Sequence, residues 1–193
     1  DRDGDPYING ILDYCHGHTG GQADYHFHFA PTCVIEAPDG TEEHYNIVAF
    51  AMDGYPIIAH YRGVHGKEGA EAFDWLETSG YEPDADYKED VVDGGGTSTY
   101  VWDKYDYEAK RAGRTLDECN GRALAKLTLA SGNTFDEASF LGFDYGYFVT
   151  AEFPYFIAKY RGTAGTSGGG RQGGGGQLPG GDGGDDAVTA VFP

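Results

Sequence analysis

Hydrophobic and polar residues alternate over several short stretches of the chain, which is the pattern of half-buried β-strands. These stretches are rich in β-branched and aromatic side chains, and Gly, Pro or Asp separates them. The pattern predicts strands at residues 24–29, 33–37, 45–52, 56–61, 98–102, 126–130, 144–150 and 155–161. Helical spacing of apolar positions predicts one short helix, at residues 67–78. The expected fold is mainly β, because strands and helices do not alternate as they do in α/β enzymes.

The last thirty residues have a different pattern. Glycine is concentrated here, with 13 of the 32 glycines between residues 162 and 184, so residues 163–184 are interpreted as a flexible linker. The linker separates a β-domain, residues 1–162, from residues 185–193, where apolar and polar positions alternate as in a strand. A strand on such a tether is expected to dock on a sheet edge, of its own chain or of a neighbouring subunit. The residues expected to dock are Val188, Ala190, Val191 and Phe192.

Short segments of the β-domain recur in the same order. Residues 12–18 (LDYCHGH) match residues 116–122 (LDECNGR) at the Leu, Asp, Cys and Gly positions. Similar pairs lie upstream and downstream, at residues 4–8 and 54–58 and at residues 24–29 and 144–149. The matches predict two copies of one unit, residues 4–33 and 54–154, the second expanded by insertion. The predicted domain is therefore an antiparallel β-sandwich-like fold built from two degenerate repeats.

These motifs resemble the YHYH-domain family over residues 4–162. The family pattern has two rounds of Gly-x-Pro, Leu-Asp-x-Cys-x-Gly-His and Tyr-His-Tyr-His. The present chain has Tyr25-His26-Phe27-His28 in the first round, Asp53-Gly54-Tyr55-Pro56-Ile57 between the rounds, and Pro154-Tyr155 with Arg161-Gly162 near the end. In the second round, the family's histidines are replaced by Arg122, Gly146 and Phe148. The resemblance therefore implies that a histidine site is kept by the first copy alone.

Four of the seven histidines fall within thirteen residues, namely His16, His18, His26 and His28. They form two His-x-His pairs, and on a strand this spacing places both imidazoles on one face. Two such strands side by side would present up to four ring nitrogens, which suits Zn or Cu. The alternative is a structural role, in which His16 and His18 lie in a turn and buried rings donate to backbone carbonyls, Asp13 or Asp24.

The charge balance bears on partners. There are 13 Lys and Arg against 32 Asp and Glu, and the formal net charge is −19. Nucleic acid and anionic membranes are therefore disfavoured, and divalent cations are the expected small partners. Asp1, Asp3 and Asp5 alternate as carboxylate ligands do in Ca²⁺ loops, so they are a candidate for weak calcium binding, with a solvated acidic terminus as the alternative. No apolar run approaches the ~20 residues that a membrane-spanning helix needs.

Three cysteines permit one disulfide and leave one thiol. Cys15 and Cys119 occupy equivalent positions in the two repeat copies, so this pair is the first choice, and Cys15–Cys33 is the second. High acidity, a single Met and few cysteines favour a secreted protein located outside the cell or on its surface.

The leading functional hypothesis is a non-enzymatic structural protein, a subunit of an extracellular filament. In it, the C-terminal strand would dock on the next copy and build a head-to-tail homopolymer by strand exchange. The second hypothesis is a secreted metal-binding module that uses the four histidines, and the third is a metal-dependent enzyme. Gly-x-Ser-x-Gly, P-loop, dinucleotide and His-Glu-x-x-His motifs are missing from the sequence, so no catalytic residue is predicted.

Overall fold

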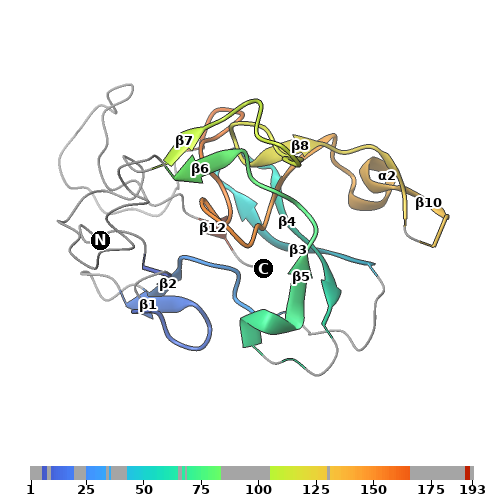
Figure 1. Cartoon of the computed structure of the whole chain (residues 1–193). Helices are drawn as coiled ribbons and strands as arrows, with labels where there is room; N and C mark the ends of the chain where they lie inside the picture. The colour runs from blue at the N-terminus through green and yellow to red at the C-terminus, as the bar shows by residue number, and fades with distance from the viewer. Residues whose placement is uncertain are drawn as a thin grey trace.

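The computed structural model describes residues 6–7, 10–19, 25–33, 35, 43–64, 67, 69–83, 105–129, 131–165 and 190–191. The fold is mainly β, with one six-stranded sheet, three two-stranded sheets and one short α-helix in the described residues (Figure 1). The prediction of a mainly β chain with one short helix is confirmed. The sandwich arrangement and the repeat boundaries stay predictions.

The six-stranded sheet has the order β12-β3-β4-β11-β8, and β5 also pairs with β4. Its strands are β3 (Glu43–Ala51), β4 (Pro56–Gly63), β5 (Phe73–Trp75), β8 (Gly121–Ala123), β11 (Tyr145–Phe148) and β12 (Ala190–Val191). The two long strands, β3 and β4, coincide closely with the predicted strands at 45–52 and 56–61. The sheet is mixed rather than antiparallel throughout, because β11 runs parallel to β4.

Both faces of this sheet are covered by hydrophobic side chains. Ile57 and Tyr147 are register partners on β4 and β11 and belong to the larger core cluster. Their neighbours Ile58 and Phe148 belong to a second cluster. Since successive strand residues point to opposite faces, the two clusters lie on opposite sides of the sheet. All four side chains are fully buried, which explains why these segments are almost continuously apolar.

Three two-stranded ribbons surround the sheet. They are β1 (Gly17–Thr19) with β2 (Tyr25–Phe27), β6 (Tyr81–Pro83) with β7 (Tyr105–Tyr107), and β9 (Lys126–Thr128) with β10 (Thr134–Asp136). Figure 1 shows the β1–β2 hairpin on the opposite side of the view from the helix α2 (Glu137–Leu141). In the part of the chain that the structure describes, no helix has the length and apolar character needed to cross a membrane.

The helix predicted at residues 67–78 is wrong. A 3-10 helix (Gly69–Ala72) and strand β5 lie there instead. Phe73 and Trp75 alternate with an exposed aspartate and pack on Tyr61 of β4, with ring centroids 5.1 and 5.6 Å apart. Pairing with β4 therefore outweighs the weak helical spacing of these residues.

The only α-helix in the described residues is α2, which the hydrophobic pattern does not reveal. Its five residues are too few to show a helical period. The helix is defined by its ends, because the Asp136 carboxylate accepts from the Ser139 backbone N–H at 3.1 Å and Gly142 adopts φ 79°. These are ordinary N-cap and C-cap signals.

Other predicted strands are also corrected. Residues 155–161 form no strand, since Tyr155 has φ 69° and the alternation there reflects buried side chains of an irregular segment. The described residues of 33–37 form no strand, and the predicted strand at 98–102 lies outside the described residues.

Candidate metal centre

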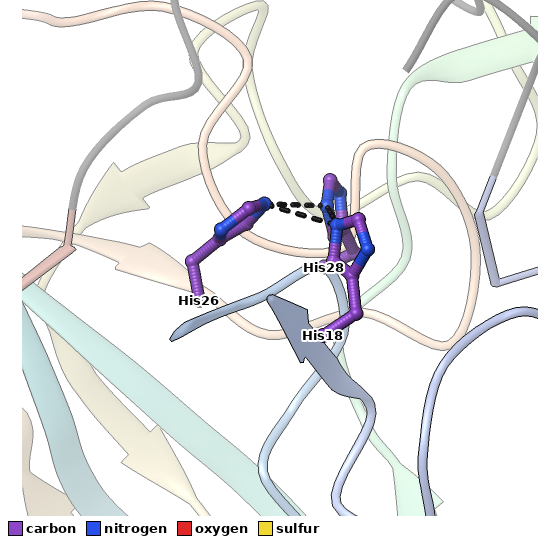
Figure 2. A group of neighbouring side chains, drawn as sticks. All are labelled: His18, His26 and His28. Carbon is purple, nitrogen blue, oxygen red and sulfur yellow. Dashed lines mark hydrogen bonds between the residues drawn. The ribbon is translucent and has the colours of Figure 1, made fainter. Parts of the chain in front are cut away.

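The β1–β2 hairpin brings three histidines to one point. His18 on β1 lies directly opposite His26 on β2 in the antiparallel register. His28 lies two residues beyond His26, and its backbone N–H donates to the His16 carbonyl oxygen at 3.1 Å, which continues the ladder past β2. Residues two apart on a strand share a face, so the three imidazoles project together, as Figure 2 shows.

The Nε2 atoms of the three rings are mutually close. The separations are 3.1 Å between His18 and His26, 2.8 Å between His18 and His28, and 3.0 Å between His26 and His28. The Nε2 of a neutral imidazole is either a donor or an acceptor, never both. At least two of the three atoms therefore have the same role, and all three contacts cannot be hydrogen bonds at once. A cation bound by three lone pairs removes this conflict.

The spacing also fits a metal ion. Zn–N bonds are about 2.0–2.1 Å, so two ligands of a tetrahedral ion lie about 3.3 Å apart, close to the separations here. The three rings form the one group of at least three metal-ligating side chains in the described part of the chain, and each is half-buried. Burial, and then the nearby His26 and His18 rings, lower the pKa of His28 to about 4. The ring is therefore neutral at pH 7, as a ligand must be.

A turn held by Asp13 positions β1. Its Oδ1 atom accepts from the backbone N–H groups of Cys15 and Gly17 at 2.8 and 3.2 Å, and Oδ2 accepts from the Tyr25 hydroxyl at 2.6 Å. This last bond lowers the pKa of Asp13 and raises that of Tyr25 to about 12. A Cβ at Gly17 would lie 2.5 Å from the Tyr25 ring, so glycine lets this ring pass close to the backbone of the turn. The Asp13 carboxylate thus ties the turn to β2, which carries His26 and leads directly into His28.

His16 does not join the group, although the sequence predicts it as a ligand. It precedes β1 in the turn with φ 63°, so it does not share the strand face of His18. Its Nδ1 lies 2.9 Å from the Ala30 carbonyl oxygen, and its ring packs edge-on against Tyr7 and Phe29. His16 therefore has the structural role that was the alternative for this cluster.

The disulfide joins Cys15 to Cys33, so the first choice, Cys15–Cys119, is wrong and the second choice is confirmed. Strand β2 returns the chain to the turn that precedes β1, and the Cα atoms of Cys15 and Cys33 are 5.1 Å apart. Cys119 is a free thiol buried in the larger core cluster. Cys15 and Cys119 occupy equivalent positions in the sequence, but no disulfide joins them.

The turn at residues 117–121, called the second turn, repeats the backbone of the turn at residues 13–17, called the first turn. Asp117 accepts from the N–H groups of Cys119 and Gly121 at 2.9 and 3.2 Å, and from the Tyr145 hydroxyl at 3.0 Å. Asn120 adopts φ 61°, close to the value of His16 at the equivalent place. Strands β8 and β11 then pair as β1 and β2 do, with Arg122 opposite Gly146. The two segments therefore make equivalent sets of hydrogen bonds, one around Asp13 and the other around Asp117.

The side chains that follow the second turn differ. Arg122 stands on β8 where His18 stands on β1, and its guanidinium lies 4.3 Å from the centre of the Phe148 ring. It forms ion pairs with Glu77 at 2.7 Å and Glu137 at 2.6 Å. A Cβ at Gly146 would lie 2.4 Å from Ile58 Cδ1, so no ligand fits there. A guanidinium between two buried carboxylates thus occupies the second turn, and a metal site is excluded there.

The polar contacts of Glu77 extend across the sheet. His60 Nδ1 lies 2.9 Å from Glu77, its Nε2 lies 3.6 Å from Glu43, and Glu43 also pairs with Arg62 at 2.6 Å. Burial alone would raise the pKa of Glu77, but hydrogen bonds from His60 and Arg122 lower it to about 2. Sequence analysis missed this network. The one available signal was a basic residue, Arg122, at the sequence position that matches His18 in the first motif.

Two predicted sites fall wholly or partly outside the described residues. Asp1, Asp3 and Asp5, the candidate calcium ligands, lie outside them. Of the predicted assembly strand, Ala190 and Val191 form β12, which pairs antiparallel with β3 of the same chain at Ala51 and Phe50. Val188 and Phe192 lie outside the described part.

The family model described as "YHYH protein" matches residues 4–162, which is more than half of the chain and includes both turns. No curated protein and no solved structure matches the chain.

Proposed function

The chain belongs to the YHYH protein family, and we propose that the first hairpin of this member binds one transition metal ion, Zn²⁺ or Cu²⁺, through His18, His26 and His28. The observation that carries the proposal is the convergence of three Nε2 atoms within 3.1 Å of one another. Imidazole suits Zn and Cu, whereas Ca²⁺ and Mg²⁺ prefer oxygen ligands. The formal net charge of −19 favours any cation near the surface.

Metal content tests the proposal. Untagged protein is stripped with a chelator and then dialysed against Zn²⁺ or Cu²⁺. It is expected to retain about one ion per chain, as measured by inductively coupled plasma mass spectrometry. Ca²⁺ and Mg²⁺ serve as controls and are expected not to displace the bound ion. Less than a tenth of an equivalent of either transition metal, at micromolar free concentration, would contradict the proposal.

We also propose that the protein is located outside the cell. A disulfide closes the hairpin that carries all three ligands, and disulfides persist mainly in oxidising compartments. An extracellular or surface location therefore agrees with the chemistry of the site.

Assembly into a filament is a second candidate function, favoured by the pairing of β12 with β3. The strand at the end of the chain covers an edge of the six-stranded sheet. The same edge on another copy offers identical backbone groups, so strand exchange between copies would conserve these hydrogen bonds. Head-to-tail exchange of this kind builds an open polymer rather than a closed dimer.

Deletion of residues 185–193 is expected to abolish fibres and leave monomers of nearly the full 20.8 kDa. The reason is that β12 would be lost while the sheet retains its other strands. Electron microscopy and sedimentation velocity measure the outcome, with thermal unfolding as the control that the shortened chain folds. Fibres of unchanged geometry from the shortened chain would refute the strand-exchange mechanism.

A further inference from the structure

Residues 161–165 are fastened to the turn that joins β3 to β4. The backbone N–H of Gly165 donates to the Met52 carbonyl oxygen at 2.8 Å. The backbone N–H of Gly162 donates to Asp53 Oδ2 at 3.0 Å. Both acceptors belong to the two residues that directly follow β3, so the chain is held there just before residues 166–189 begin.

A buried tyrosine reinforces this contact. The hydroxyl of Tyr147 donates to Asp53 Oδ2 and accepts from the Arg161 backbone N–H at 2.7 Å. Tyr147 lies on β11 and is fully buried, so it joins the turn and the segment after it to the interior of the sheet. The sequence motifs at residues 53–54 and 161–162, which the histidine site does not use, therefore meet at one place.

The chain returns to the same place at β12. Ala190 lies opposite Ala51, the last residue of β3, and Val191 lies opposite Phe50. Residues 166–189 thus leave the fold beside one end of β3 and come back at the same end. Whatever path they take, pairing of β12 with its own chain requires them to span little net distance.

We infer that the edge of β3 at Phe50 and Ala51 is a docking surface for an extended strand, and that β12 of the same chain covers it in preference to β12 of another copy. This inference rests on the proposed strand exchange. Pairing within a chain and pairing between chains form the same backbone hydrogen bonds. The two arrangements therefore differ in the entropy of bringing the strand to the edge rather than in their contacts.

The size of this preference follows from concentration. A strand tethered beside its own edge acts at an effective concentration of about 1 mM, whereas the strand of another copy acts at the concentration of the chain itself. The chain is therefore a closed monomer in dilute solution. It exchanges strands and builds filaments only as its concentration approaches about 1 mM.

Cysteines at one register pair report which chain supplies the strand. Directly opposed strand residues have Cβ atoms about 4.5–5.5 Å apart, within reach of a disulfide. The full-length double variant Phe50→Cys/Val191→Cys can form the bond within one chain or between chains. An equimolar mixture of the two single variants can form it only between chains. Both samples are oxidised under the same mild conditions, and peptide mapping by mass spectrometry quantifies the bond between positions 50 and 191.

At a chain concentration of about 1 µM, the double variant is expected to form this bond at least about 10-fold faster than the mixture and to remain monomeric. The difference is expected to shrink as the concentration rises toward about 1 mM. The neighbouring register pair, Ala51→Cys/Ala190→Cys, is expected to give the same result. Thermal unfolding verifies that each variant folds.

The matched control is Asp74→Cys/Val191→Cys. Asp74 is an exposed residue of β5, which β3 and β4 separate from β12 in the sheet. This variant is expected to form no bond faster within the chain than between chains.

Equal rates for the double variant and the mixture at about 1 µM would overturn the inference, because the chain's own strand would then have no advantage. Folded double variants of both register pairs that form no bond would overturn it as well, since β12 would then not lie on this edge. A different outcome separates the filament proposal. If the mixture stays unlinked at about 1 mM while the double variant links fully, the preference stands and strand exchange between copies is refuted.

Discussion

Replacing His28 with alanine is expected to weaken Zn²⁺ binding by more than about 100-fold. Its Nε2 atom lies 2.8 Å from that of His18 and 3.0 Å from that of His26, so its removal leaves two ligands. Two imidazoles cannot hold the ion against water as three do. Isothermal titration calorimetry of the stripped protein measures the loss. The metal-dependent rise in melting temperature should disappear with it, because an ion that binds only the folded state stabilises that state.

The matched control is His16→Asn. Asparagine stands at the equivalent place in the second turn, as Asn120, with almost the same left-handed φ. The variant therefore keeps the backbone of the turn and removes an imidazole that lies outside the group. We expect Zn²⁺ affinity within about 3-fold of the wild type. A loss as large as that of His28→Ala would show that His16 is a ligand and that the three-histidine assignment is wrong.

Arg122→Met is expected to lower the free energy of unfolding by about 3–5 kcal/mol. The substitution keeps an unbranched apolar stem over Phe148 but removes the charge between Glu77 and Glu137. The Glu137 side chain is fully buried and that of Glu77 is 4 % exposed, so both carboxylates would be left in the interior with their main cation gone. Unfolding in urea, followed by tryptophan fluorescence, measures the change.

Two further variants isolate the cause. Adding Glu77→Gln and Glu137→Gln to Arg122→Met removes the buried charges and is expected to recover most of the lost stability. Lys67→Met breaks an ion pair of exposed side chains, with Glu71, and is expected to cost less than about 1 kcal/mol. If Arg122→Met costs no more than Lys67→Met, the buried network does not stabilise the fold.

Much of the site was predictable from the sequence, because strand geometry is local. The β-branched and aromatic residues of β3 and β4 located the two central strands, and the His-x-His spacing placed His26 and His28 on one face. The cross-strand position of His18 follows once the hairpin is expected. The exclusion of His16 was not predictable, since it depends on a left-handed φ in the turn and on contacts with Tyr7 and Phe29.

The contacts between residues far apart in the chain could not be predicted from the sequence. Arg122 meets Glu77 and Glu137 only because β8, α2 and the segment after β5 converge, and no local pattern reports that convergence. The parallel pairing of β11 with β4 has the same origin. The strand β5 was missed for a related reason, because its three residues gain stability from Tyr61 on β4 rather than from their own propensity.

In the proposed metal site, the Cys15–Cys33 disulfide would make the redox state of the hairpin and its metal occupancy interdependent. The closed loop spans a sequence separation of 18 and contains all three histidines, so the bond narrows the range of conformations from which the ligands must assemble. Thermodynamic linkage then requires reciprocity: by whatever factor the bond strengthens metal binding, the bound metal opposes reduction of the bond by the same factor. A strong reductant and a chelator should therefore act synergistically. Removal of the metal makes the disulfide easier to reduce, and reduction of the disulfide makes the metal easier to remove.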